Sequence, residues 1–407
     1  MATKLEALSK EELIQLILCY REQYEPGTAN LRTASPHAAA PVQSEREKRK
    51  KQRPAGRPFD MSRYEQRHIA LRISYIGTNY SGFAWQADTP ETVEGRLIEA
   101  LCKTRLIESR DSCDWSRGGR TDKGVSALGQ VYACRLRSAL SKEMLSKETR
   151  ELLEPTEQIV DQPTADQPLT QIAESGCDAE GAPKLPPKVE AKPEEEMDYV
   201  RVINRVLPSD IRVLSWAPAP TDFSARFSAT HRTYKYFFVR ETLSIERMRQ
   251  GCDYLIGEHD FRNFCKIDPT VTNFRRRIIS FDVQPVDGFN GCGVDAPQAV
   301  WAFTVCGSAF LWHQVRCLVA VLFMIGKKLE TPEVILSLLD TELLPARPLY
   351  DMAPEAPLVL YDIGYSALEW QSSSYNLSAL SKLWAQRRMA RTQCCALSLR
   401  TQCVPHF

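Results

Sequence analysis

Alternating apolar and polar residues predict a series of half-buried strands in the middle of the chain. In residues 68–75 the side chains of Ile69, Leu71 and Ile73 occupy every second position, which is typical of a strand with one face in the core. Similar alternation predicts further strands over residues 129–136, 211–216, 234–239, 279–283, 301–305 and 358–365. Glycines between the strands at 279–283 and 301–305 predict that these two form a hairpin.

Helical spacing of apolar residues places helices between these strands. Residues 93–101 carry apolar side chains at every fourth position, and a second helix is expected over residues 199–207, before a proline. Thr331 followed by Pro332 predicts the N-cap and first residue of a third helix, which ends near residue 339. Strands that pair locally with helices between them indicate an α+β fold around a largely antiparallel sheet.

Three segments differ in composition from this body. Residues 1–63 contain an amphipathic helix with a capping box at Ser9 and Glu12, a linker, and seven basic residues between positions 46 and 57. Such a basic cluster is typical of a nuclear-import signal or a nucleic-acid-binding arm, and equally of a solvated tail. Residues 141–198 are rich in Glu, Gln, Asp and Pro, so we expect a disordered insertion there.

The net charge of +1 conceals an uneven distribution. Residues 151–198 hold 13 acidic and 3 basic side chains, a balance of −10, which leaves +11 for the rest of the chain. A basic body is typical of a protein that binds a polyanion, although lysines and arginines that only solvate the surface give the same balance.

Several classes of protein are disfavoured by composition. The longest apolar run, over residues 317–326, is too short for a membrane span, and the first residues lack the layout of a secretory signal. Thirteen cysteines without C-x-x-C spacing argue against zinc and against a disulfide framework. We therefore expect no metal site, no membrane association and a reducing compartment.

The segment GGRTDKG at residues 118–124 concentrates chemically useful side chains. Its glycines allow a close approach to a ligand, and they bracket a guanidinium, a hydroxyl, a carboxylate and an ammonium group. The same letters are also typical of a tight turn in which Asp122 binds backbone amides. No phosphate-binding loop or dinucleotide fingerprint occurs in the sequence.

Together with four other segments, this one resembles the TruA family of tRNA pseudouridine synthases. The matching segments, in the order of the family, are YIGTNYSGF (75–83), GGRTDKGVSALGQV (118–131), ARFSAT with RTYKY (225–236), GEHDF (257–261) and FLWHQVR (310–316). The resemblance covers roughly residues 66–368. Lys123 and Ser126 differ from bacterial members, and the overall pattern is most similar to the eukaryotic branch that modifies tRNA positions 38 and 39.

The resemblance implies a set of site residues. Asp122 falls on the nucleophile, Arg316 and Arg120 on active-site arginines, and Tyr234 on a tyrosine that contacts the substrate. We expect Arg316 to hold Asp122 ionised and Arg120 to point toward RNA. His313 is expected to be structural. Further contacts to RNA phosphates are expected from Lys123, Arg226, Arg232 and Lys235; the arginines at 275–277 fit either this role or a solvated strand edge.

The resemblance also implies the architecture and the partners. We expect two lobes, at residues 64–222 and 223–368, with a mixed, largely antiparallel sheet shared across both and helices flanking it; residues 369–407 form a tail. A homodimer would bind tRNA without any cofactor, in the nucleus and cytoplasm. Two alternatives remain open: a synthase acting at tRNA positions 27 and 28, and a catalytically inactive RNA-binding or tRNA-chaperone protein on the same fold.

Overall fold

The computed structural model describes residues 59–153, 195–286 and 293–372. The chain divides into two units after Pro58, and all described residues belong to the second unit. The expected N-terminal helix, linker and basic cluster therefore lie outside the described residues. So do most of the expected acidic insertion and all but the first residues of the C-terminal tail.

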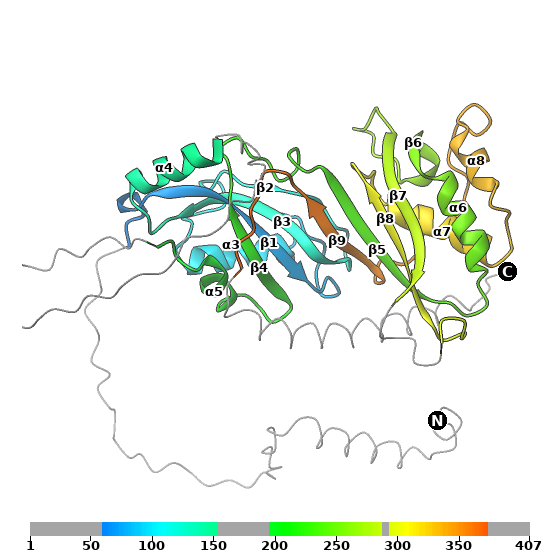
Figure 1. The fold of residues 1–407 in the computed structure, drawn as a ribbon, viewed down its shortest axis with the longest axis horizontal. Helices are drawn as coiled ribbons and strands as arrows, with labels where there is room; N and C mark the ends of the chain where they lie inside the picture. The colour runs from blue at the N-terminus through cyan, green and yellow to red at the C-terminus, as the bar shows by residue number, and fades with distance from the viewer. Residues whose placement is uncertain (1–58, 154–194, 287–292, 373–407) are drawn as a thin grey trace, which may run out of the picture. The chain divides into compact units, whose positions relative to one another are not determined.

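Helices are interspersed among the strands along the described chain (Figure 1). The strands are β1 (Gln66–Tyr75), β2 (Ser116–Arg117), β3 (Ser126–Arg137), β4 (Ile211–Pro218), β5 (His231–Val239), β6 (Gly257–Asp260), β7 (Arg275–Pro285), β8 (Val300–Gly307) and β9 (Leu358–Gly364). The helices are η1 (Met61–Arg63), α3 (Val93–Lys103), α4 (Lys142–Leu153), α5 (Tyr199–Asn204), α6 (Ile245–Tyr254), η2 (Arg262–Phe264), α7 (Gln314–Gly326) and α8 (Val334–Leu339).

The described strands form one nine-stranded sheet. Its order is β4-β1-β3-β9-β5-β8-β7-β6, with β2 paired to β3 beside this path. Among these pairs, β3 and β9 run parallel, whereas all the other pairs are antiparallel. The expected α+β class with a mixed, largely antiparallel sheet is confirmed, and so is the hairpin of β7 and β8.

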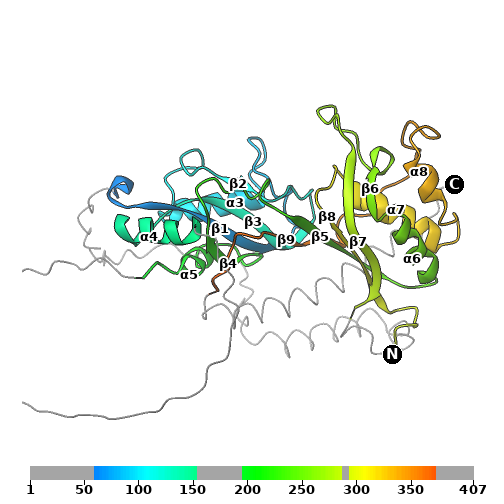
Figure 2. The ribbon, with the colours of Figure 1, turned by 45° about the horizontal axis from the view of Figure 1, so that its top comes forward.

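Two hydrophobic cores lie along this sheet. The first core consists of buried residues between positions 69 and 225, joined by Leu360, Ile363 and Leu368. The second core consists of buried residues between positions 236 and 358, joined by Val125. Helices α6, α7 and α8 gather beside the β5-β8-β7 part of the sheet in Figure 2, and α7 is buried around most of its circumference. The lobe boundaries expected from sequence remain a prediction.

The loop between β2 and β3 passes from one core to the other. Val125 packs in the second core, whereas Ala127, two residues later on β3, packs in the first. The loop that carries Asp122 is therefore held between the two cores, which is the arrangement that fixes the position of its side chains.

Three local features differ from the sequence-based expectations. Helix α4 occupies the start of the segment expected to be disordered, because Ser141 caps it: its hydroxyl accepts a hydrogen bond from the Met144 amide. At the other end of that segment Glu196 is buried in an ion pair with Arg67 at 3.0 Å. Helix α8 begins at Val334 rather than at Pro332, since a turn that closes on the Thr331 carbonyl precedes it.

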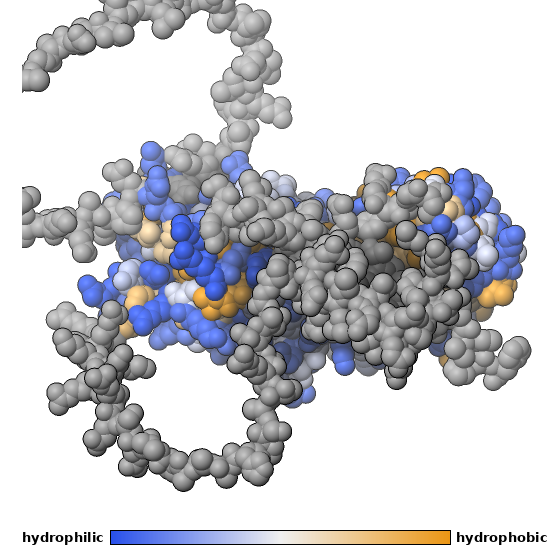
Figure 3. Space-filling model, turned by 90° about the horizontal axis from the view of Figure 1, so that it is seen from below, coloured by the Kyte–Doolittle hydropathy of each residue, from blue (hydrophilic) through white to orange (hydrophobic). Residues whose placement is uncertain are grey.

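On the face seen in Figure 3 the described residues are mostly hydrophilic, with scattered apolar side chains. No helix within the described ranges is long and apolar enough to cross a membrane.

Candidate active site

The backbone around Asp122 is fixed by close approach to residues 75–83. Gly82 has φ +103°, and a Cβ there would lie 2.8 Å from the Thr121 carbonyl oxygen. The Phe83 amide donates to that same oxygen at 3.1 Å, and the Tyr75 hydroxyl lies 2.7 Å from Thr121 Oγ1. Because Thr121 is buried and bonded on both sides, the side chain of the next residue leaves the loop in a defined direction.

The Asp122 side chain meets the beginning of α7. Nε2 of His313 lies 3.4 Å from Oδ2 of Asp122, and the two side chains are 12% and 28% exposed respectively. His313 is the N-cap residue of α7 and has φ 60°, a left-handed conformation that is uncommon for residues other than glycine. Burial lowers the pKa of His313, and the Asp122 charge opposes this shift.

Arg316 is hydrogen-bonded to the segment that precedes β9. Its Nε donates to the Ala353 carbonyl at 2.7 Å, and its Nη2 donates to Oε2 of Glu355 at 3.0 Å. Its guanidinium therefore ties α7 to that segment, and His313, one helical turn earlier, is the side chain that reaches the Asp122 carboxylate. That Arg316 holds Asp122 ionised stays a prediction.

Tyr234 lies where the two cores meet. It shares a face of β5 with Tyr236, whose ring contacts Phe323 of α7 at a centroid distance of 5.8 Å. The Tyr234 ring packs edge-to-face on Phe310 at 5.2 Å and contacts both cores. Burial raises the pKa of Tyr234 to about 12; Arg232 lowers it and Asp122 raises it further. These two charges place Tyr234 in the electrostatic neighbourhood of the carboxylate.

All three nitrogens of the Arg232 guanidinium donate hydrogen bonds to backbone carbonyls. Nε and Nη2 donate to the Gly118 carbonyl at 3.1 and 2.8 Å, Nη2 also donates to Arg226 at 2.7 Å, and Nη1 donates to Ser308 at 2.9 Å. The residue expected to bind a phosphate thus joins three loops around the site. Sequence reasoning did not anticipate this role.

The other basic residues of the expected set differ in accessibility. Arg120 and Lys123 are exposed and make no ion pair within the described residues. Arg226 is exposed, and its guanidinium lies 5.2 Å from the ring centroid of Phe227. Lys235 alternates with Tyr234 along β5, so it points to the opposite face of the sheet, where its ammonium lies 4.4 Å from the Tyr361 ring.

His313 was expected to be a structural histidine at a helix start, and it is the N-cap residue of α7; its contact with Asp122 was not anticipated. It precedes Arg316 by three positions in FLWHQVR, and this spacing places both side chains on one face of a helix. That spacing was the signal in the sequence that could have placed His313 at the site. Among the described residues, no group of three or more His, Cys, Asp or Glu side chains is placed to hold a metal ion.

The arrangement fits chemistry by a carboxylate. Asp122 combines a rigid backbone, partial exposure and the His313 imidazole at its side, and exposed cationic groups stand two residues before it and one after it. A carboxylate of this kind can act as a nucleophile toward a bound, negatively charged substrate.

Comparison with known proteins agrees with these observations. The model of a family described as tRNA pseudouridine synthase matches residues 252–366. The chain is 44% identical to the bovine tRNA pseudouridine(38/39) synthase over 336 residues, which cover 81% of this chain and 63% of the relative. It is 38% identical to the Saccharomyces cerevisiae protein of the same name, covering 89% of this chain and 72% of the relative.

An archaeal relative extends the similarity over nearly its whole length. The chain is 33% identical to tRNA pseudouridine synthase A of Methanothrix thermoacetophila, over 79% of this chain and 93% of that protein. The chain belongs to the TruA family of tRNA pseudouridine synthases.

Proposed function

We propose that this protein isomerises uridine to pseudouridine at positions 38 and 39 of tRNA, with Asp122 as the nucleophile. The observation that carries the proposal is the Asp122 carboxylate, held between two cores and 28% exposed beside His313. The similarity to relatives named tRNA pseudouridine(38/39) synthase supports the choice of positions. The chain spans 63% of the bovine relative, so activity, substrate and partners are proposed for this chain on its own residues.

The proposed reaction suits these residues. Isomerisation breaks the N-glycosidic bond of uridine and rebuilds a carbon–carbon bond within the same nucleotide, without net oxidation or phosphoryl transfer. The base must leave its stack, and an aromatic ring such as Tyr234 offsets part of that cost. The Asp122 carboxyl group then meets the exposed nucleotide, while Arg120 and Lys123 face the phosphates.

The test is pseudouridine formation by the purified protein on an unmodified tRNA transcript. Asp122→Asn should abolish product while tRNA affinity stays equal or rises, because affinity comes mainly from phosphate contacts. Tyr234→Phe keeps the ring and should retain part of the activity. Wild-type single-turnover rates in Asp122→Asn would overturn the assignment of the nucleophile.

A pseudouridine map of tRNA from cells without this protein tests the positions. Loss at positions 38 and 39 supports the proposal. Loss at positions 27 and 28 alone would replace it with the second branch of the family, and an unchanged map, with tRNA binding intact, would indicate an inactive RNA-binding protein.

We further propose that the protein acts as a homodimer in the nucleus and cytoplasm. Both statements derive from the sequence, the second from the basic residues between positions 46 and 57. Light scattering of the full chain should give twice the mass of 46.2 kDa. Deleting residues 44–57 should leave the protein cytoplasmic, and an unchanged nuclear signal would contradict that expectation.

A further inference from the structure

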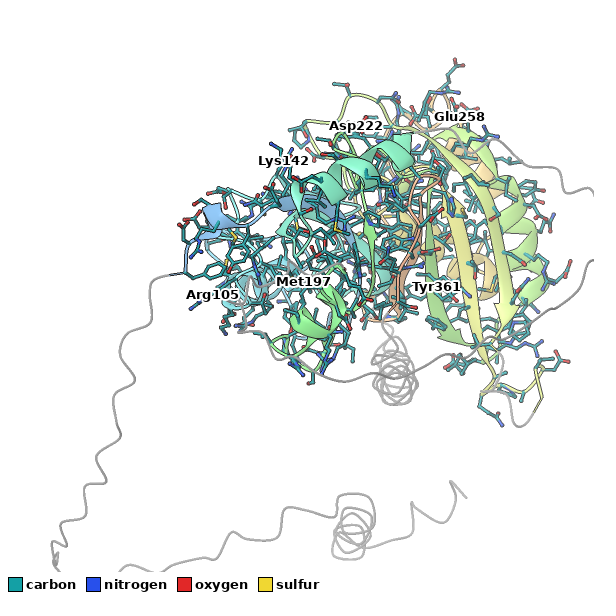
Figure 4. The ribbon with its side chains drawn as sticks, turned by 60° about the vertical axis from the view of Figure 1, so that its left-hand side comes forward. Arg105, Lys142, Met197, Asp222, Glu258 and Tyr361 are labelled. Carbon is teal, nitrogen blue, oxygen red and sulfur yellow. The ribbon has the colours of Figure 1, made fainter. Side chains whose placement is uncertain are left out.

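One large aromatic side chain stands in solvent beside the candidate active site. Phe227, in the connection between β4 and β5, is 80% exposed. Single exposed apolar residues are common on protein surfaces and by themselves indicate nothing. Phe227 differs because the turn that carries it is rigid and because that turn is bonded to the loop of Asp122. Figure 4 labels Asp222, near the start of this connection.

The turn is fixed by hydrogen bonds at each of its sides. The Ser228 amide donates to the Ser224 carbonyl at 2.8 Å, and the Ser224 amide donates to the Ser228 hydroxyl at 3.1 Å. The Ala225 amide donates to the Ser116 hydroxyl at 3.0 Å, and the Ala225 carbonyl accepts from the Tyr365 hydroxyl at 2.6 Å. Phe227 is therefore presented to solvent by an ordered backbone, at little further cost in conformational entropy on binding.

Arg232 places this turn next to the site. Its Nη2 donates to the carbonyls of both Arg226 and Gly118, so these two backbone oxygens share one nitrogen. Gly118 begins the segment that carries Asp122. Arg232 and Tyr234 are two positions apart on β5, so their side chains share one face of that strand. The turn of Phe227, which Arg232 binds, therefore lies on the same side of the sheet as Tyr234.

The surroundings of Phe227 indicate the chemistry of its ligand. The Arg226 guanidinium lies 5.2 Å from its ring centroid, and Arg120 is exposed in the neighbouring loop. An exposed ring beside a guanidinium suits a planar base that is attached to phosphates, because the ring stacks on the base while the arginine meets the phosphate backbone. A purely apolar protein partner would leave these charges without partners.

We propose that Phe227 and Arg226 form a stacking site for an unpaired nucleobase of the substrate RNA, close to the nucleotide that reaches Asp122. This proposal rests on the proposed function, since it takes tRNA as the ligand. It assigns Phe227 to binding rather than to catalysis, so its loss should weaken affinity without changing the chemistry of bound RNA.

Equilibrium binding of unmodified tRNA to the full-length protein tests the stacking site. Phe227→Ala should weaken binding by about 5- to 150-fold, the usual worth of stacking one base, whereas Phe227→Tyr should stay within about twofold of wild type. The matched control is Leu349→Ala, since Leu349 is a fully exposed apolar residue in the loop before β9; it should leave affinity unchanged. Unchanged affinity in Phe227→Ala would overturn the proposal.

The salt dependence of tRNA binding distinguishes the contribution of the Phe227 ring from that of the Arg226 guanidinium. Phe227→Ala should keep the slope of log K against log salt, because it removes no charge. Arg226→Gln should reduce the magnitude of that slope by the amount that corresponds to about one lost phosphate contact. An unchanged slope in Arg226→Gln would contradict the part assigned to the guanidinium.

A scan of single abasic nucleotides through the anticodon loop identifies the base. One abasic position should weaken binding to wild type but not to Phe227→Ala, which is the non-additivity expected of two groups in contact. A lower oligomeric mass of Phe227→Ala in light scattering would instead show that the ring belongs to a protein interface, and would overturn the proposal. Absence of pseudouridine with wild type would refute the proposed function alone, since the binding measurements do not depend on turnover.

Discussion

Replacing Arg232 tests whether it supports the site or binds RNA. Its guanidinium makes four hydrogen bonds to three backbone carbonyls, at 2.7 to 3.1 Å. A hydrogen bond to a charged group contributes about 1.5–3 kcal/mol, but Arg232 is half-buried and water can replace part of what is lost. We expect Arg232→Met to lower the free energy of unfolding by about 2–4 kcal/mol, a shift of the urea midpoint on the order of 1 M.

A lysine at this position distinguishes geometry from charge. Arg232→Lys keeps the charge but presents it at a single point, so it cannot reach three carbonyls at once. It should recover less than half of the lost stability, and both variants should keep the wild-type salt dependence of tRNA binding. If Arg232→Met leaves the urea midpoint unchanged and instead reduces the salt slope by about one, Arg232 binds a phosphate and the structural role is refuted.

Three further predictions concern neighbouring features. His313→Gln keeps a hydrogen-bond donor about as far along the side chain as Nε2 of His313, so its single-turnover rate should stay near that of wild type. His313→Asn tolerates the left-handed backbone better but has a shorter side chain, and its single-turnover rate should fall about tenfold. The opposite order of the two rates would show that backbone strain, and not the contact with Asp122, matters. Although burial alone would raise it, the pKa of Glu196 is lowered by the hydrogen bonds it accepts from neighbouring amides, Ser138 and Arg67. The stability it supplies is therefore present above the ordinary carboxyl pKa, about 4.3, and lost as the pH falls through the folded-state value, so the urea midpoints of wild type and Glu196→Gln should differ more at pH 7 than at pH 3. Gly124→Ala, at φ +80°, should lower the thermal midpoint in keeping with a cost of about 1–2 kcal/mol, whereas Gly119→Ala, where a Cβ meets nothing within 4 Å, should leave it unchanged.

Local pattern was sufficient for seven of the nine strands of the sheet, but not for β2 and β6, and the loop of Asp122 was recognised from the resemblance to a family. The alternation in residues 68–75 predicted β1, and residues 234–239 predicted most of β5, because each strand has one face in a core. Pattern could not give the order of the sheet. The insertion of β9 between β3 and β5 depends on pairing between strands more than 100 residues apart, which no local periodicity encodes.

The partners of charged groups were the least predictable part of the site. The sequence does not indicate that Glu355 and the Ala353 carbonyl bind Arg316, because both precede β9 in a segment without a recognisable pattern. Arg232 was expected at phosphates because its charge is visible in the sequence, whereas the three carbonyls that bind it are not. The residue type shows that a side chain is charged. Which acceptor binds that side chain depends on the tertiary fold.

The central position of β9 has a consequence for synthesis of the chain on the ribosome. β3 and β5 are joined in the sheet only through Leu358–Gly364, so both strands keep an open edge until these residues emerge. An open edge can pair with another nascent chain. A transcript cut short before codon 358 would thus yield two incomplete sheets with adhesive edges, and we expect such products to aggregate or to be bound by chaperones rather than persist as half-active fragments.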